Sequence, residues 1–391
     1  MQNSKTSLLS NSLLWLGAAI SIAEIMTGAL FAPLGFTKGM MAIILGHAIG
    51  ALLFYWAGLI GAKSGMTAME SVRISFGEKG SMFFSVLNVL QLVGWTAVMI
   101  ISGAQAIAVI AGKTTGSLFF WCLVIGIMIA IGIVIGLKNL GKVNVIAVSL
   151  LFILTVVLAV VIFRSDSGTT AAIVGTMSFG AAVELSVAMP LSWLPLVADY
   201  TKEAEKPVAA TLVSSVTYFL GSCWMYIIGL AAALFAGTSD VAQVMVTAGL
   251  GLAGTLIILL ATVSTTFLDV YSAGVSLNNI SSKINIKWAA IIVCIIGTLI
   301  AMFTPVEQYE NFLYAIGSVF APMVAILITD FFILKENHAT KSLNITNVIL
   351  WIVGFIIYRR FMTIDTIIGS TVPVMIIISL LAVLVKKVIR K

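Results

Sequence analysis

Apolar runs of about 20 residues recur along the whole chain, and each is long enough to cross a bilayer as a helix. This feature limits the possible folds more than any other. The chain is 61% hydrophobic and only 9% charged, whereas soluble domains carry about 25% charged residues. An outer-membrane barrel would show short alternating segments instead. The pattern therefore predicts an all-α polytopic membrane protein.

The apolar runs predict about twelve transmembrane helices in one integral domain over residues 1–391. No linker or soluble domain separates them. The first run is interpreted as a retained helix and not as a signal peptide, because a second run follows it directly. The predicted helices lie at residues 12–36, 39–61, 81–112, 118–137, 143–163, 174–198, 207–236, 243–276, 287–304, 311–334, 344–359 and 364–386.

The basic residues predict which side of the membrane each loop faces. Loops on the cytoplasmic side carry an excess of Lys and Arg. With both termini cytoplasmic, 16 of the 21 basic residues fall on the inner side. The remaining basic residues are Lys38, Lys113, Arg164, Arg359 and Arg360. This bias predicts a multi-pass protein of the cytoplasmic membrane with both termini inside.

The first and sixth predicted helices contain proline at membrane depth. The first carries Pro33 near its outer end, and the sixth carries Pro190 and Pro195. Proline removes a backbone donor, and non-helical backbone persists within a membrane only where it lines a protein cavity. Two interrupted helices, five positions apart, are typical of transporters built from two inverted five-helix repeats. The predicted division is residues 12–163 and 174–334 for the repeats and 344–386 for two added helices.

Three carboxylates fall inside apolar runs: Glu24, Glu184 and Asp269. A carboxylate at the bilayer centre costs about 3 kcal/mol. These residues therefore indicate a polar interior, and they are candidates for substrate binding. The alternative is a purely structural role as hydrogen-bond partners between helices.

One face of the helix at residues 81–112 combines an aromatic ring with amides. Asn88, Gln91 and Trp95 recur at spacings that place them on that face. An indole, amides and carboxylates around one cavity suit a flat heterocycle, because the ring can stack while the polar groups read its edge. Trp193 is a further candidate contact. For Trp95 alone, the alternative is an ordinary core or interfacial aromatic.

The helix at residues 243–276 offers hard oxygen ligands. Ala261, Ser264 and Thr265 fall on one of its faces, and hydroxyl and carbonyl oxygens are the ligands that hard cations require. They predict a sodium site if carbonyls of an unwound first helix complete the shell. The alternative is that both hydroxyls bond only to carbonyls of their own helix.

The remaining motifs predict no cofactor. GLGLAG at residues 249–254 matches a dinucleotide fingerprint, but it lies within an apolar helix and lacks the preceding strand that the fingerprint needs. Close helix packing through small residues explains it better. The three cysteines lie far apart within apolar runs. His47, in the second predicted helix, and His338, in a loop, are expected to be isolated.

Taken together, these segments resemble the nucleobase–cation–symport family 1, the cytosine, allantoin and hydantoin permeases. The most specific is FLYAIGSVFAPMVAILITDFFI at residues 312–333. PLVADYTK at 195–202 resembles the stretch that ends the sixth helix of this family. GWTAV at 94–98 resembles its substrate-stacking segment, and ATVSTT at 261–266 resembles its cation motif. The resemblance covers essentially the whole chain.

The resemblance implies an inverted-repeat fold and uptake that is coupled to sodium or protons by alternating access. It implies that Trp95 stacks on the substrate. It also implies a sodium ion between the eighth helix and an unwound first helix. The implied sodium ligands are Ile20, Ala23, Ala261, Ser264 and Thr265.

Glu24 marks a departure from the family pattern. The family offers a neutral polar side chain near the substrate, and Glu24 aligns with that position. A carboxylate accepts two hydrogen bonds and so prefers an edge with two donors, such as an amine beside a protonated ring nitrogen. Glu24 and Glu184 are predicted to read this edge, with Gln91, Trp193 and Asp269 as further contacts. Glu24 is also a candidate for carrying a coupling proton.

The expected function is import of a pyrimidine across the bilayer. MPLSWLPLVADYT at residues 189–201 resembles the hydroxymethylpyrimidine transporter branch, which is linked to thiamine synthesis. Cytosine is the alternative substrate. The rival classes are a non-coupled facilitator, a membrane enzyme and an amino-acid symporter. The sequence shows no nucleophile–base pair that would support an enzyme. Glu24 would repel the carboxylate of an amino-acid substrate. We expect no nucleic-acid ligand and no obligate protein partner.

Overall fold

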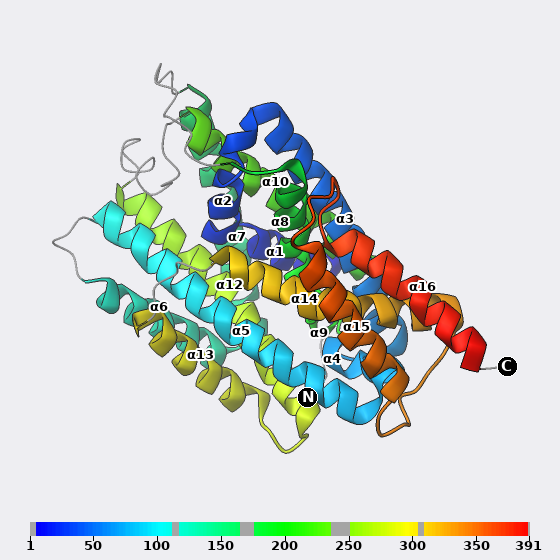
Figure 1. The fold of residues 1–391 in the computed structure, drawn as a ribbon. Helices are drawn as coiled ribbons and strands as arrows, with labels where there is room; N and C mark the ends of the chain where they lie inside the picture. The colour runs from blue at the N-terminus through cyan, green and yellow to red at the C-terminus, as the bar shows by residue number, and fades with distance from the viewer. Residues whose placement is uncertain (1–4, 112–116, 165–175, 236–250, 304–308, 390–391) are drawn as a thin grey trace.

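The computed structural model describes residues 5–111, 117–164, 176–235, 251–303 and 309–389. The named elements within these residues are all helices, and Figure 1 shows them packed into one bundle. This arrangement confirms the predicted all-α polytopic fold. The start of the predicted helix at 243–276 and the first two residues of GLGLAG lie outside the described residues.

The long helices follow the predicted order, and most of their ends lie within a few residues of the expected positions. The long helices are α3 (Gly35–Ser64), α5 (Arg73–Ala111), α6 (Leu118–Ile135), α7 (Leu137–Arg164), α10 (Pro207–Phe235), α12 (Gly251–Ile280), α13 (Ile286–Phe303), α14 (Tyr309–Ile328), α15 (Ile345–Phe361) and α16 (Thr371–Ile389). The shorter elements are α1 (Leu8–Ala19), α2 (Ile22–Ala29), η1 (Ala32–Leu34), α4 (Ala68–Ser71), α8 (Phe179–Ser192), α9 (Val197–Thr201) and the π-helical η2 (Thr329–Leu334).

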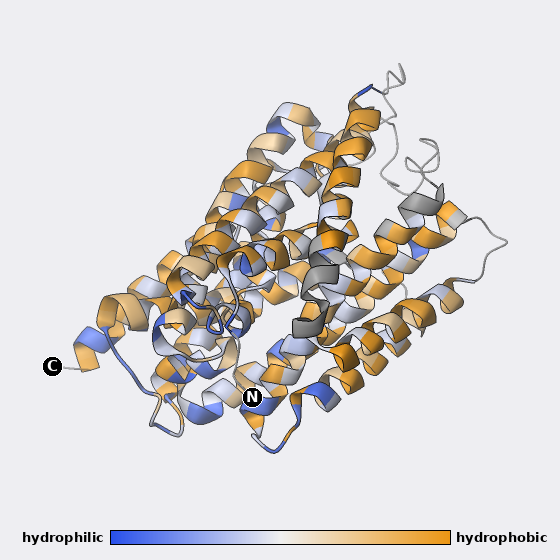
Figure 2. Ribbon diagram, turned by 180° about the vertical axis from the view of Figure 1, so that it is seen from behind, coloured by the Kyte–Doolittle hydropathy of each residue, from blue (hydrophilic) through white to orange (hydrophobic). Residues whose placement is uncertain are grey.

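The outer faces of the bundle are apolar enough to contact lipid. Within the described residues, nine helical segments are long and apolar enough to cross a membrane. Large apolar side chains such as Leu90, Ile153, Leu220 and Leu380 are more than half exposed on these helices. Figure 2 shows hydrophobic residues along the length of the outer helices. Because such faces would be unfavourable in water, they indicate an integral membrane protein.

The first predicted helix is broken, but at a different position from its proline. Between α1 and α2 the chain leaves helical geometry at Ile20 and Ser21. The Ser21 hydroxyl accepts a hydrogen bond from the Glu24 backbone N–H at 3.3 Å and so caps α2. Pro33 instead lies in η1, after α2 has ended. The break therefore places Glu24 in the first turn of a new helix.

The sixth predicted helix is broken between α8 and α9. Pro190 lies inside α8, whereas Pro195 lies in the non-helical connection. From α5, the side-chain amides of Asn88 and Gln91 donate to the backbone carbonyls of Pro195 (3.2 Å) and Ser192 (2.9 Å). A helix end leaves its last carbonyls without helical partners. These amides therefore stabilise the break.

Small residues allow the broken helices to approach their neighbours closely. A Cβ atom on Gly28 of α2 would lie 2.1 Å from the Tyr226 carbonyl oxygen of α10. A Cβ atom on Gly229 of α10 would lie 2.0 Å from the Ile25 carbonyl oxygen of α2. Both approaches are possible only without a side chain. α10 is thereby held directly beside the helix that carries Glu24.

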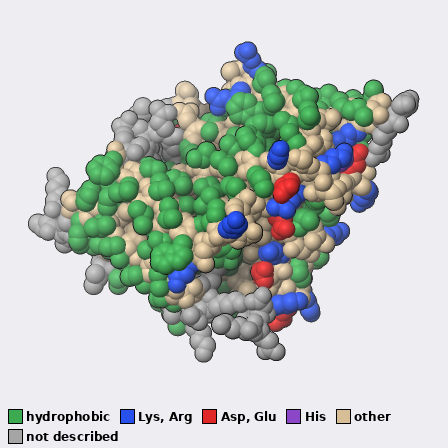
Figure 3. All heavy atoms as spheres, turned by 90° about the horizontal axis from the view of Figure 1, so that it is seen from below, with side chains coloured by type: hydrophobic (Ala, Val, Ile, Leu, Met, Phe, Trp, Pro, Cys, Tyr) green, Lys and Arg blue, Asp and Glu red, His purple; other side chains and the backbone are tan. Residues whose placement is uncertain are grey.

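Several predicted inner loops meet at one end of the bundle. The backbone of Thr6 pairs with the backbone of Glu203 at 3.0 Å, and the Ala68 N–H donates to the Asp199 carboxylate at 2.9 Å. The Glu78 N–H donates to a carbonyl in the loop before α15. Figure 3, which looks at the bundle from below the view of Figure 1, shows charged side chains beside an expanse of hydrophobic ones. Which side of a membrane this end faces stays a prediction, as does the division into two repeats.

α16 begins later than the sequence pattern predicts. The apolar run suggests a start at residue 364, but residues 362–370 form turns and α16 starts at Thr371. Gly369 has a φ of +72°, and a Cβ atom there would lie 2.4 Å from the Glu184 carboxylate. Glu184 therefore occupies the space in front of α16, and the chain can turn there only because residue 369 is glycine.

Candidate functional site

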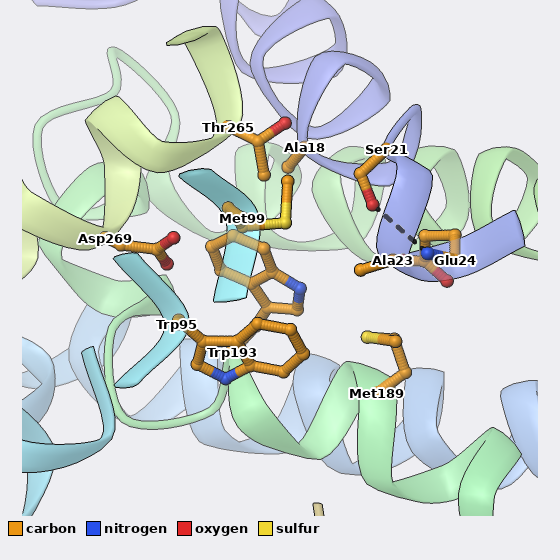
Figure 4. Close-up of a pocket in the computed structure, with 10 residues that line it drawn as sticks. All are labelled: Ala18, Ser21, Ala23, Glu24, Trp95, Met99, Met189, Trp193, Thr265 and Asp269. Atoms are coloured by element: carbon orange, nitrogen blue, oxygen red, sulfur yellow. Dashed lines mark hydrogen bonds between the residues drawn. The ribbon is translucent and has the colours of Figure 1, made fainter. Parts of the chain in front are cut away.

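A pocket lies where the break between α1 and α2 faces α5, α8 and α12 (Figure 4). Four of the six predicted substrate contacts line it: Glu24, Trp95, Trp193 and Asp269. Two of the predicted sodium ligands also reach it. The full lining consists of Ala18, Ser21, Ala23, Glu24, Trp95, Met99, Met189, Trp193, Thr265 and Asp269.

Two indole rings form much of the wall of this pocket. Trp95 of α5 and Trp193, which follows α8, are both buried, and Figure 4 shows them between Asp269 on one side and Glu24 on the other. The edge of Trp15 packs against Trp193 at a centroid distance of 5.4 Å, and Phe312 packs in the same way against Trp95. These contacts fix flat apolar surfaces on which a planar ring can stack.

Asp269 is the polar group most available to a ligand. Its side chain is only 3% exposed, and Figure 4 shows its carboxylate pointing into the pocket. Among the described residues, no donor lies within hydrogen-bond distance of this carboxylate. A buried carboxylate without donors is unfavourable. A ligand that brings hydrogen-bond donors would therefore bind here with a favourable change in free energy.

Glu24 is buried beside the same pocket, but it already has partners. It is 1% exposed, and its two carboxylate oxygens accept hydrogen bonds from the hydroxyls of Tyr218 (2.7 Å) and Ser222 (2.6 Å). Both hydroxyls lie on α10, one helical turn apart. Glu24 therefore belongs to a hydrogen-bond network at the edge of the pocket, and neither of its partners is evident from the sequence pattern.

The expectation that both histidines are isolated is wrong. His47 of α3 is fully buried, and its Nε2 lies 2.6 Å from the Ser222 hydroxyl, which also contacts Glu24. His338 lies 2.9 Å from a carboxylate oxygen of Glu336. The contact of His47 was missed because residues 24, 47 and 222 are far apart in sequence. The one available signal was the spacing of Tyr218 and Ser222, which places two hydroxyl groups on one face of α10.

Glu184 lies outside the pocket, at the N-terminus of α16. One carboxylate oxygen accepts from the Tyr358 hydroxyl and from the Thr371 hydroxyl (2.6 Å). The other accepts from the backbone N–H groups of Ser370 (2.6 Å) and Thr371 (2.8 Å). Four donors occupy this carboxylate and cap a helix, so its geometry supports a structural role. We therefore leave Glu184 out of the proposed substrate contacts.

Gln91 is also not among the residues that line the pocket. Its side-chain N–H₂ group donates to Asn88 and to the Ser192 carbonyl, both at 2.9 Å. Gln91 lies one helical turn before Trp95 on α5. Its amide donates to the end of α8 and so stabilises the break between α8 and α9. Its effect on a ligand would act through the position of Trp193.

The predicted sodium ligands make different contacts. The Thr265 hydroxyl donates across to the Gly17 carbonyl of α1 at 3.3 Å. The Ser264 hydroxyl donates to the Ala261 carbonyl of its own helix at 3.1 Å. The Ala23 carbonyl accepts a hydrogen bond from the Thr27 hydroxyl at 2.7 Å, and we leave Ala23 out of the proposed ligands. Of the two hydroxyl side chains predicted on α12, that of Thr265 is the one that reaches the first helix. The backbone of Ile20 lies within the unwound turn between α1 and α2.

A second cluster of ionisable groups lies at the far end of α16. Asp330, Glu336 and His338 are close enough to share a cation. The ammonium group of Lys386 already contacts both carboxylates, at 3.0 Å for Glu336. Asn347 donates to the other oxygen of Asp330 at 2.8 Å. This cluster therefore carries its own cation and ties α16 to η2.

The sequence matches the family described as permease for cytosine/purines, uracil, thiamine and allantoin, over residues 2–378. Among curated proteins, the cytosine permease of Escherichia coli strain K12 is 28% identical over 358 residues, which cover 88% of this chain and 83% of that protein. The cytosine permease of Escherichia coli O157:H7 matches with the same identity and coverage.

The fold matches solved transporter structures over nearly the whole chain. Mhp1, a nucleobase-cation-symport-1 family transporter, in a closed conformation with bromovinylhydantoin bound, gives a TM-score of 0.82 at 19% identity and covers 97% of this chain and 91% of its own. A Na⁺-coupled sialic acid symporter gives a TM-score of 0.72 at 16% identity, with 96% and 88% covered. At these identities the structures establish the fold only.

The fold, the pocket between broken helices and the match along the chain agree with one another. They indicate a secondary transporter of nucleobase-like substrates and not an enzyme. The comparisons do not distinguish a hydroxymethylpyrimidine branch, and the curated relatives are cytosine permeases. The chain belongs to the nucleobase–cation–symport family 1, the permeases for cytosine/purines, uracil, thiamine and allantoin.

Proposed function

We propose that this protein is a symporter that imports an amine-bearing pyrimidine, with cytosine as the leading substrate. The observation that carries the proposal is the carboxylate of Asp269, which points into a pocket walled by Trp95 and Trp193 and has no donor among the described residues. Similarity to cytosine permeases over most of the chain supports the same substrate.

The chemistry of the pocket favours a flat ring with donors on one edge. Trp95 and Trp193 offer faces for stacking, and aromatic stacking on a base contributes about 1–3 kcal/mol. Asp269 can accept a hydrogen bond from an exocyclic amine. If one proton lies between the carboxylate and the adjacent ring nitrogen, a second hydrogen bond forms, whichever of the two groups carries that proton. Cytosine presents this edge.

Asp269 replaces Glu24 as the main reader of the amine edge in this proposal. Both oxygens of Glu24 already accept hydrogen bonds from α10, so a substrate donor would have to compete with two buried hydroxyls. Asp269 has no such competitor. Glu24 remains a candidate contact at the opposite side of the indole pair (Figure 4).

Hydroxymethylpyrimidine is the second candidate substrate. It has an amine beside a ring nitrogen, as cytosine does. The segment that carries the resemblance to its transporters, residues 189–201, supplies Met189 and Trp193 to the pocket. Uptake would proceed by alternating access, with sodium or protons as the coupled ion. Thr265, Ser264 and the Ile20 carbonyl are the proposed contacts for sodium, because the carbonyls of Ala23 and Ala261 already accept hydrogen bonds from side-chain hydroxyls.

A thermal-shift titration of the purified protein tests the substrate. We expect cytosine, and more weakly hydroxymethylpyrimidine, to raise the unfolding temperature, because a ligand that binds only the folded state stabilises it. Asp269→Asn should weaken cytosine binding by about 10- to 100-fold, since a hydrogen bond to a charged group contributes about 1.5–3 kcal/mol. Asp365→Asn, in the loop before α16, is the matched control and should bind as the unmodified protein does.

Two results would contradict the proposal. One is stabilisation by a purine but by no pyrimidine. The other is unchanged cytosine affinity in Asp269→Asn. Uptake into vesicles then separates a symporter from a facilitator, because only a symporter accumulates cytosine above its external concentration when an ion gradient is imposed.

A further inference from the structure

A continuous chain of hydrogen bonds runs from the pocket to α3. The Trp193 indole N–H lies 2.8 Å from the Tyr218 hydroxyl, which lies 2.7 Å from one oxygen of Glu24. The other oxygen of Glu24 lies 2.6 Å from the Ser222 hydroxyl. Ser222 lies 2.6 Å from Nε2 of His47, whose Nδ1 lies 2.9 Å from a backbone carbonyl of its own helix. Every side chain in this chain is buried.

The direction of the bonds at the pocket end is fixed by chemistry. An indole nitrogen can only donate, so the Tyr218 hydroxyl accepts from Trp193. Tyr218 then has one hydrogen of its own, and it donates this hydrogen to Glu24. At this end, every hydrogen bond is therefore satisfied when the Glu24 oxygen next to Tyr218 acts as an acceptor.

The direction at the other end is fixed in the same way. The Ile43 carbonyl can only accept, so Nδ1 of His47 must carry a hydrogen. A neutral imidazole has one N–H group, and in that case Nε2 is an acceptor that takes the hydrogen of Ser222. The Ser222 hydroxyl then has no hydrogen left for Glu24.

The two bonds of Ser222 therefore need one more hydrogen than neutral His47 and ionised Glu24 supply. Two contacts, from Nε2 to the hydroxyl and from the hydroxyl to the carboxylate, require two hydrogens. Ser222 supplies one of them. The second sits either on Nε2, which makes an imidazolium, or on the carboxylate of Glu24. In both cases the pair of His47 and Glu24 is electrically neutral and every contact is satisfied.

We propose that His47 and Glu24, bridged by Ser222, form a binding site for one proton that is transported with the substrate. This inference rests on the proposed symport function. It adds His47 to the machinery and favours a proton as the coupled ion. When the proton leaves, one of the two short contacts of Ser222 loses its hydrogen. A buried polar contact without its hydrogen is costly, so proton loss favours a rearranged network.

The network connects this change to the substrate. Tyr218 holds the indole N–H of Trp193, which lines the pocket, and Glu24 lies in the first turn after the break in the first helix. Alternating access requires at least two states of the transporter. If the proton stabilises the arrangement that these residues have in one state, the two states differ in their affinity for the proton. A difference of this kind is what couples an ion to a conformational change.

Other ionisable groups near His47 or Glu24 come from α10 and α12. The ring of Tyr226 packs edge-on against the imidazole at 4.5 Å, and Cys223 lies near Glu24 on the same helix as Tyr226. Asp269 of α12 faces Glu24 across the pocket (Figure 4). None of these groups is positively charged. Among the described residues, the extra proton is therefore what compensates the negative charge of Glu24.

α8 also packs against α3 and adds no ionisable group beside His47. Gly46 of α3 packs against Ser186, and Gly50 packs against Pro190. The carboxylate of Glu184, on the same helix, is directed to α15 and α16 instead. Among the described residues, the proton count therefore involves His47, Ser222 and Glu24.

The test uses the full-length protein in vesicles with either a pH gradient or a sodium gradient. The unmodified protein should accumulate labelled cytosine when a pH gradient, alkaline inside, is imposed without sodium. In Ser222→Ala and His47→Gln, this accumulation should fall at least about tenfold relative to cytosine counterflow in the same vesicles, which is within the usual range of coupling factors. Ser214→Ala removes a buried, unpartnered hydroxyl from the same helix, and His338→Gln removes the second imidazole. Both controls should accumulate cytosine normally.

Accumulation that follows only the sodium gradient would overturn the proposal. So would pH-driven accumulation in both Ser222→Ala and His47→Gln at the level of the controls. A second measurement requires no substrate: infrared difference spectra follow the carboxylic acid and imidazole bands as the pH changes. We expect these bands to titrate in the unmodified protein and to titrate at a shifted pH in Ser222→Ala. In His47→Gln the imidazole band of His47 should be absent and the carboxylic acid band should titrate at a shifted pH. Identical titrations in all proteins would also overturn the proposal.

The two measurements separate this inference from the proposed function. If the unmodified protein neither binds cytosine nor exchanges it, the substrate assignment fails, and the infrared titration still decides whether the proton site exists. If cytosine is exchanged but not accumulated on a pH gradient, the substrate assignment stands and the proton site fails.

Discussion

Glu24 and Glu184 are both buried glutamates on broken helices, yet their surroundings differ in kind. Glu24 accepts two hydrogen bonds, and both donors are side-chain hydroxyls of α10. Glu184 accepts four, and two of its donors are backbone N–H groups at the start of α16. The first lies at the edge of the pocket, and the second lies away from it.

The type of donor explains what each glutamate can do. A hydroxyl hydrogen rotates about its C–O bond. The two hydroxyls that contact Glu24 can therefore donate to another acceptor, or they can accept a hydrogen bond when Glu24 is protonated. Backbone N–H groups of a helix cannot turn, and the positive end of the helix dipole adds to their attraction for a carboxylate. Glu184 is therefore suited to holding a helix in place, and Glu24 is suited to a network that changes during transport.

The clearest test of this comparison is the stability of the two glutamine variants. Glu184→Gln should lower the free energy of unfolding by about 3 kcal/mol or more, because several buried donors lose a charged acceptor. Glu24→Gln should lower it by about 1 kcal/mol, since its hydroxyl partners can redirect. Thermal unfolding in detergent measures both, with the exposed Glu310→Gln as a control. A larger loss in Glu24→Gln would reverse our interpretation of the two sites.

The other end of α16 offers a second anchor of similar strength. Lys386→Met leaves two acidic groups without their ammonium partner and should cost about 3 kcal/mol in stability. The adjacent, exposed Lys387→Met is the matched control and should change stability little. Adding Asp330→Asn to Lys386→Met should recover part of the loss, because it removes the buried unpaired charge. No recovery would mean that the ion pair is not what holds this end.

On the pocket side, the comparison predicts loss of affinity without a comparable loss of stability. Trp95→Ala should weaken cytosine binding by about 2 kcal/mol, the typical contribution of stacking on one base, which is roughly 30-fold in affinity. Trp95→Phe keeps an aromatic face and should lose less. Equilibrium binding of labelled cytosine measures both variants. Equal affinity in all three proteins would exclude stacking on Trp95.

The smallest expected effect concerns the contact between α12 and the unwound first helix. Thr265→Val removes a hydroxyl that donates to α1 and should cost about 1 kcal/mol in stability. Thr266→Val removes a hydroxyl that bonds within its own helix and serves as the control. If sodium supports uptake, Thr265→Val should also raise the sodium concentration required. Identical behaviour of the two variants would argue against a role for this contact.

The order of the long helices could be predicted from the sequence because hydrophobic length is a local property of the chain. The same is true of the existence of two broken helices. The position of the first break was not predictable from proline, because the chain leaves helical geometry at Ile20 and Ser21, where no proline lies. A serine cap and the packing of glycines against α10 determine that position.

The candidate site was predicted less completely. Asp269 was identified because an acidic residue is unusual inside an apolar run, and Trp95 because it shares one helix face with Asn88 and Gln91. The contact between His47 and Ser222 was missed, because nothing in the local sequence of either residue indicates that α3 and α10 meet there.

The sequence by itself determined that this protein is an all-α membrane protein with carboxylates inside its apolar runs, since composition and hydrophobic length are sufficient for that conclusion. Only the tertiary structure decided where each carboxylate lies and which groups surround it. It placed Asp269 in the pocket, gave Glu24 a link to His47, and gave Glu184 to α16. The physical reason is that the effect of a buried charge depends on which donors surround it, and those donors come from helices that are distant in the chain.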